Sequence, residues 1–95
     1  MLQKFDDVVV ELNTPLGSVF TGRVTTLELR TSDSVIAINP PNQAYLSLTH
    51  ITQLTLRVGT EFMSFRLKNA AGGLNNGRLT VLAEEIRRER VPNKQ

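Results

Sequence analysis

The sequence predicts an all-β fold, an antiparallel β-sandwich or flattened barrel of about 8–10 short strands that ends in a short C-terminal helical stub. Two segments, Gly22–Arg30 and Ile51–Val58, alternate with a period of two, which is typical of half-buried strands. Turn-forming residues separate the extended segments at intervals of roughly eight to twelve residues. With 95 residues there is room for one hydrophobic core, so we expect a single domain over residues 1–95.

The N-terminal part of the chain is expected to hold two strands. Residues 5–12 contain three consecutive Val, which favour extended structure, and residues 13–17 (NTPLG) have turn chemistry. The next strand carries Thr25, Leu27 and Leu29 on one face and Val24, Thr26, Glu28 and Arg30 on the other.

A short apolar strand over residues 35–38 is expected between two connections. The turn before it is TSDS, residues 31–34. The loop after it is NPPN, residues 39–42, whose two adjacent prolines remove two backbone donors and exclude a central strand.

The second half of the chain is expected to form further hairpins. An extended segment at 45–49 is followed by Ile51–Val58, with Leu54, Leu56 and Val58 facing inward, and a turn at 59–61 leads into a partner strand at 62–67. Residues 69–73 (NAAGG) are small and predict a flexible connection. Asn76-Gly77 suits a type I′ turn before the last strand, 78–83.

Residues 84–95 predict a charged helical stub and tail. Glu84 and Arg88 are spaced i,i+4, acids precede bases, and Pro92 ends the segment. Ile86 is the only apolar residue within the charged run at 84–90, so the helix is expected to be short.

The composition offers little material for catalysis. There is no cysteine, and the one histidine, His50, is better explained as a strand-end residue than as a ligand or a base. We therefore expect no catalytic residue, metal site or cofactor. Asp6-Asp7 points to opposite faces of a strand, and the glycines near residue 72 lack the Lys-Ser or Lys-Thr pair of a phosphate-binding loop.

Nucleic-acid and membrane binding are also disfavoured. Only three aromatic residues lie in the expected strands, Phe62, Phe65 and Tyr45. The basic residues of neighbouring strands are better explained as ordinary solvent-facing positions; they are Arg57, Arg66, Lys68 and Arg78. No apolar run approaches the roughly 20 residues that span a bilayer. A cytosolic protein, or one on the cytosolic side of a membrane, is the simplest expectation.

Three blocks of the sequence are specific in their combined order and spacing. They are TPLG and VFTGRV at residues 14–24, AGG at 71–73, and NGRLTVLAE at 76–84. Together they resemble the N-terminal β-sandwich domain of the epsilon subunit of F-type ATP synthases, the subunit called delta in mitochondria. The resemblance covers residues 8–88. The loop at 37–45 departs from the family pattern, and no pair of helices follows the sandwich, which implies a shortened or divergent form.

The resemblance implies a non-catalytic docking domain of the rotor stalk. Its partners would be the gamma subunit and the c-ring, and the domain would reach the membrane only through the complex, on the cytoplasmic side of a bacterial membrane. The family's contact region corresponds here to Thr31, Ser32, Asp33, Ser34, Asn39, Pro40, Pro41, Asn42 and Gln43. The alternative is a divergent β-sandwich interaction module that binds another partner or associates with itself through an edge strand.

Overall fold

The computed structural model describes residues 8–38 and 45–89. Within these ranges the chain forms seven strands and no helix, which confirms the all-β prediction. The strands are β1 (Val8–Thr14), β2 (Gly17–Val24), β3 (Thr26–Thr31), β4 (Val35–Ile38), β5 (Leu46–Val58), β6 (Glu61–Asn75) and β7 (Arg78–Glu89). The last three are longer than expected because adjoining predicted segments merge, which explains why seven strands form where about 8–10 were expected.

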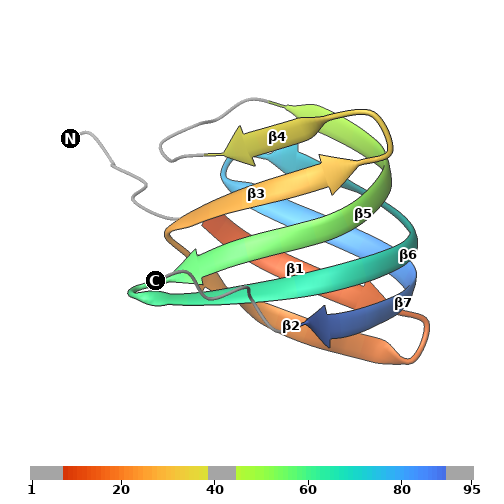
Figure 1. The fold of residues 1–95 in the computed structure, drawn as a ribbon, viewed down its shortest axis with the longest axis horizontal. Helices are drawn as coiled ribbons and strands as arrows, with labels where there is room; N and C mark the ends of the chain where they lie inside the picture. Colours follow the sequence, from red (N-terminus) through yellow and green to blue (C-terminus); the bar gives the residue numbers. More distant parts are fainter. Residues whose placement is uncertain (1–7, 39–44, 90–95) are drawn as a thin grey trace.

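The strands form one continuous sheet in the order β2-β1-β7-β6-β5-β3-β4 (Figure 1). Every neighbouring pair is antiparallel except β1 and β7, which run parallel, so the sheet is mixed rather than purely antiparallel. The expected type I′ turn joins β6 to β7, with Asn76 at φ 52° and Gly77 at φ 74°.

The sheet folds into two layers because its three longest strands bend. Inward-facing residues on a strand are normally two apart, but β6 buries Leu67 and then Ala70, and β7 buries Ala83 and then partly Ile86. In β5 the register shifts on both sides of Ile51, beside His50 at φ 56°. In β6 the bend falls at Asn69, with φ 50°, whose side-chain amide donates to Glu84 on β7. We call this line of bends the corner.

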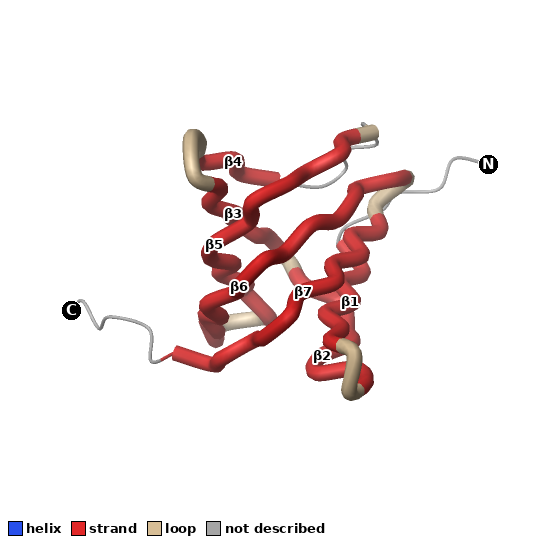
Figure 2. Tube along the Cα trace, turned by 90° about the vertical axis from the view of Figure 1, so that its right-hand side faces the viewer, coloured by secondary structure: helices blue, strands red, loops and turns tan. Residues whose placement is uncertain are grey.

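The corner divides the sheet into what we call the β1 layer and the β3 layer. The β1 layer holds β2, β1 and the parts of β7, β6 and β5 that pair near β1; the β3 layer holds β4, β3 and the remaining halves of the long strands. Figure 2 shows β3, β4 and β5 on one side and β1 and β2 on the other, with β6 and β7 between them. This arrangement is a sandwich made from one bent sheet.

Aliphatic side chains from both layers fill the space between them. Phe20 of β2 reaches across to Phe65 of β6, with ring centroids 6.0 Å apart. The largest fully buried side chains are Val8, Val10, Leu12, Val24, Leu29, Ile38, Ile51, Leu54, Leu56, Leu74, Leu79 and Val81. The burial of such side chains, at roughly 1.5–3 kcal/mol each, is the main force that holds the layers together.

Several expectations for single segments were wrong. Glu84–Glu89 belongs to β7 and is not a helix, because each of residues 85–89 pairs with a residue of β6; the rest of the expected stub, 90–95, lies outside the described residues. Residues 69–73 lie inside β6 and do not form a flexible connection. The expected strand around Gly22–Arg30 breaks at Thr25, whose backbone N–H donates to the Arg57 carbonyl, so that Val24 and Leu27 are both buried.

Candidate docking surface

The turn between β3 and β4 holds the first four residues of the predicted contact region. The Thr31 hydroxyl accepts hydrogen bonds from the backbone N–H groups of Asp33 and Ser34, at 3.2 and 3.1 Å. The Thr31 N–H donates to the Ser34 carbonyl at 2.9 Å, which closes the turn. A threonine side chain that satisfies the amides just after it is a common way to fix a turn. Ser32, Asp33 and Ser34 are consequently held in one shape and exposed to solvent.

The same turn is anchored to the corner of the sheet. The Ser32 N–H donates to the His50 carbonyl at 3.1 Å, and the Thr52 hydroxyl donates to the Arg30 carbonyl at 3.2 Å. His50 is exposed and lies at the bend inside β5, not at the end of a strand as expected, because β5 runs on without a break from Leu46 to Val58. These hydrogen bonds hold the turn Thr31–Ser34 against β5. Val35, the first residue after it, leaves 52% of its surface exposed beside these polar groups.

The loop residues of the predicted contact region, Asn39, Pro40, Pro41, Asn42 and Gln43, lie outside the described residues. The chain reaches this loop from Ile38, which pairs with Leu27, whereas the turn leaves β3 after Arg30, which pairs with Val35. The turn and the start of the loop are thus at opposite ends of β4, about 10 Å apart at roughly 3.4 Å per residue.

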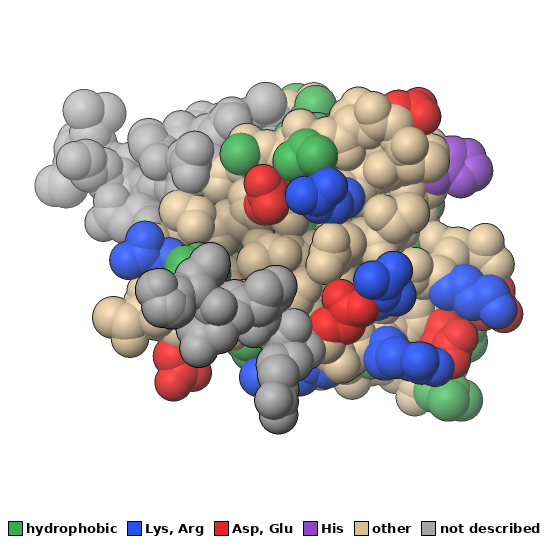
Figure 3. Space-filling view, viewed as in Figure 1, with side chains coloured by type: hydrophobic (Ala, Val, Ile, Leu, Met, Phe, Trp, Pro, Cys, Tyr) green, Lys and Arg blue, Asp and Glu red, His purple; other side chains and the backbone are tan. Residues whose placement is uncertain are grey.

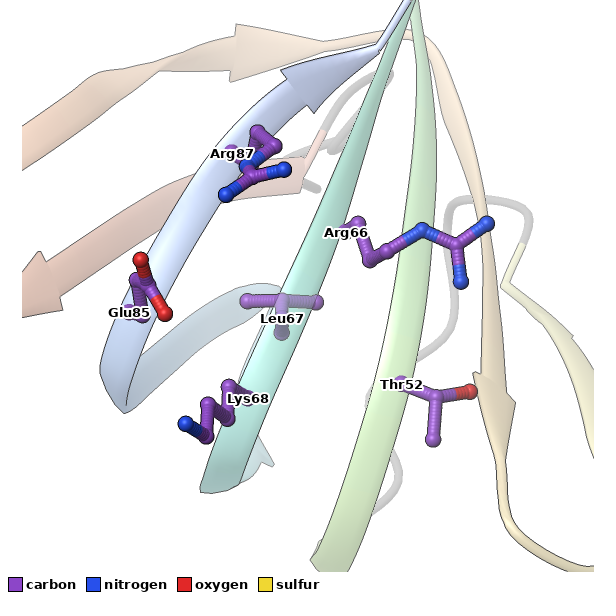
Figure 4. Close-up of a pocket in the computed structure, with 6 residues that line it drawn as sticks. All are labelled: Thr52, Arg66, Leu67, Lys68, Glu85 and Arg87. Atoms are coloured by element: carbon purple, nitrogen blue, oxygen red, sulfur yellow. The ribbon is translucent and has the colours of Figure 1, made fainter.

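A second feature of the surface is an open hollow of about 360 Å³ on the outer face of the β3 layer. Its lining is Thr52, Arg66, Leu67, Lys68, Glu85 and Arg87 (Figure 4). Lys and Arg side chains, interspersed with carboxylates, gather on this side of the molecule in Figure 3. The hollow could not be predicted from the sequence, because Arg87 was expected in a helix and could not be aligned with Arg66. The signal that could have revealed it is the register of β6 and β7.

Within 8–38 and 45–89, no three His, Cys, Asp or Glu side chains gather closely enough to hold a metal ion. The described part of the chain has no helix that is both long and apolar enough to cross a membrane.

Solved structures that share this fold include two ATP synthase assemblies. A chain in the cryo-EM structure of the Euglena gracilis mitochondrial ATP synthase, comprising OSCP, F1 and the c-ring in rotational state 1, matches with a TM-score of 0.75 at 11% identity. The match covers 92% of this chain and 56% of that one, so this chain spans little more than half the length of its neighbour. No protein-family model and no curated protein matches the sequence.

The second structure is the central stalk and c-ring of the Tetrahymena thermophila mitochondrial ATP synthase, in which a chain matches with a TM-score of 0.60 at 13% identity. That match covers 90% of this chain and 68% of the other. At such identities the likeness establishes the fold, and the fold agrees with the resemblance carried by the three sequence blocks. Both neighbours are mitochondrial, so the bacterial setting expected from the resemblance finds no support. The chain therefore has the β-sandwich fold of a chain found in mitochondrial ATP synthase assemblies.

Proposed function

We propose that this protein is a non-catalytic docking domain of the central stalk of an F-type ATP synthase, joining the gamma subunit to the c-ring on the F1 side of the membrane. The observation that carries the proposal is the agreement of two independent features. Three sequence blocks resemble the epsilon subunit, and the fold matches chains from ATP synthase structures that include the c-ring. A domain with this task transmits force by shape and contact and needs no reactive group.

The arrangement around β4 supports a domain that touches two partners. The turn Thr31–Ser34 is fixed by its own hydrogen bonds, and the loop 39–43 begins at the far end of β4. We assign the turn to one partner and the loop to the other. Between them β3 and β4 pair along their whole shared length and belong to the same continuous sheet as the other strands. A paired hairpin within a packed core resists deformation, which is what transmission of torque requires.

Binding measurements with two matched variants test this function. The full chain would be titrated by calorimetry with the gamma subunit, and separately with the detergent-solubilised c-ring, of the ATP synthase from the same species. We expect Asp33→Lys to weaken binding to one of the two by about tenfold, which is about 1.4 kcal/mol. The control is Glu61→Lys, the same charge reversal in β6 beside the β5–β6 turn, and should change neither affinity. If the unaltered chain binds neither partner, the stalk function is wrong.

The alternative of self-association is favoured by one observation, the edge formed by β2. Natural edge strands are usually short, charged or interrupted, and β4 at the other edge has only four residues. By contrast β2 has eight residues, with Arg23 as its only charged side chain and Val19 47% exposed. Sedimentation of the chain without any ATP synthase subunit tests this. A stable dimer that Val19→Lys dissociates would favour self-association, and a monomer at all concentrations would rule it out.

A further inference from the structure

Three arginines lie in a single row across the outer face of the β3 layer. The register pairs Arg30 of β3 with Gln53 of β5, Gln53 with Arg66 of β6, and Arg66 with Arg87 of β7. Residues directly paired in this way point to the same face, so the row runs across four neighbouring strands. We call these four residues the arginine row. Lys68 lies two residues from Arg66 on the same face, beside the hollow.

Carboxylates of the chain neutralise only part of this charge. Arg66 Nε lies 2.6 Å from Glu89 Oε2, and Gln53 donates to the other oxygen of Glu89 at 3.2 Å. This uses both oxygens of Glu89. No ion pair within the described part of the chain includes Arg30, Lys68 or Arg87. Arg87 is directly opposite Arg66 in the register; Glu89 offsets the charge of Arg66, and an anion from outside the chain would offset that of Arg87.

The hollow provides space for such an anion. It opens in front of Arg66, Lys68 and Arg87, and its one carboxylate is Glu85 (Figure 4). Figure 4 shows the Arg66 side chain extending over β5, on the side of Arg30, while Arg87 lies over β7, so the two arginines offer separate binding positions to an anion. The planar guanidinium group binds a carboxylate through two parallel N–H···O bonds, which makes arginine well suited to this contact.

We propose that the arginine row and the hollow together bind an acidic segment of a partner protein, with one carboxylate at Arg87 and another between Arg66 and Arg30. We choose an acidic partner because its carboxylates would complement the positive charges of the arginine row. A nucleic acid fits less well for two reasons. Its phosphates repeat at every nucleotide and would meet Glu85 and Glu89, whereas an acidic segment can carry carboxylates at the arginines alone. The exposed aromatic of this face, Phe62, already has the Arg57 guanidinium 5.9 Å from its ring centroid, which competes with base stacking. The inference stands apart from the proposed stalk function, because its test needs no ATP synthase subunit.

The test uses the full chain and a fluorescein-labelled peptide of alternating Glu and Gly, followed by fluorescence anisotropy at low ionic strength. A peptide of alternating Gln and Gly serves as the uncharged reference. We expect binding of the Glu peptide only, with affinity falling as salt is added because exposed charges are screened. Arg66→Gln combined with Arg87→Gln should weaken binding by about tenfold, or about 1.4 kcal/mol.

The matched control is Arg23→Gln combined with Arg78→Gln, which removes the same charge from the outer face of the β1 layer. It should stay within about twofold of the unaltered chain. Glu85→Gln removes the carboxylate of the hollow and should tighten binding several-fold, a gain that misfolding cannot imitate. Circular dichroism establishes that each variant is folded. Equal losses in both double variants, no binding of the Glu peptide, or tighter binding of an oligothymidylate would each overturn the proposal.

Discussion

Replacing Gly72 with alanine should destabilise the domain strongly, while the same change at its neighbour Gly73 should not. Gly72 lies in β6 opposite Val81 of β7. A Cβ atom at Gly72 would lie 2.2 Å from the Thr80 carbonyl oxygen and 3.0 Å from the Val81 Cα. Both are backbone atoms, so a rotamer change cannot relieve the contact and β7 itself must move. A Cβ at Gly73 would meet only the Leu46 carbonyl oxygen, at 3.4 Å.

Overpacking of a well-packed site typically costs 1–3 kcal/mol, and a clash with the backbone belongs at or above the upper end, so we expect about 3 kcal/mol for Gly72→Ala. In a domain of this size each kcal/mol lowers Tm by about 4–8 °C, which gives a fall of roughly 12 °C or more. Gly73→Ala should be neutral or stabilise slightly, by up to about 1 kcal/mol, because alanine reduces the entropy of the unfolded chain. Thermal and urea unfolding, followed by far-ultraviolet circular dichroism, measures both. Equal Tm values for the two variants would refute the close approach of β6 and β7.

Three further changes test the core, the hairpin turn and the docking turn. Leu54→Ala removes a side chain that is 0% exposed and should cost about 2–5 kcal/mol in urea denaturation, whereas Leu82→Ala, at a position 58% exposed, should change stability by less than about 0.5 kcal/mol. Gly77→Ala forces a side chain into φ 74° and should cost about 1–2 kcal/mol in thermal unfolding; an unchanged Tm would contradict the type I′ turn. Thr31→Val removes the acceptor of two backbone amides, so hydrogen exchange of Asp33 and Ser34 should accelerate while the core amides keep their protection.

Local features of the fold could be predicted from the sequence because each depends on a few adjacent residues. Asn76-Gly77 forms the expected hairpin turn since these two residues tolerate positive φ better than most. Leu54 and Leu56 face the core as alternation predicts. Val58, expected on the same face, is 37% exposed because it ends β5 next to the turn. Alternation of apolar and polar residues predicts which face of the sheet a side chain lies on. It does not predict how far along the strand the opposite layer of the sandwich covers that face.

Features that depend on pairing between distant segments could not be predicted in this way. The parallel contact of β1 with β7 joins residues such as Val10 and Leu79, and no local pattern marks it. The arginine row likewise exists only because the register places Arg30, Arg66 and Arg87 in line. The turn Thr31–Ser34 could be assigned as a candidate contact from the resemblance, but its anchorage to His50 depends on the bend in β5.

The corner coincides with a sequence pattern that the three longest strands share. The same order of apolar, polar, polar and apolar residues occurs at 48–51 in β5, at 67–70 in β6 and at 83–86 in β7. In isolation this spacing suits a helix, where residues three apart share a face. In a strand the two polar residues instead shift the inward face by one position, which bends the strand from one layer to the other. Because β5, β6 and β7 are neighbours in the sheet, the three bends align and the whole sheet turns at once. The alignment also sets the chemistry of the surface: beyond the corner the outward positions of β6 and β7 become Arg66, Lys68, Glu85 and Arg87, so the bend that closes the core also assembles the charged hollow.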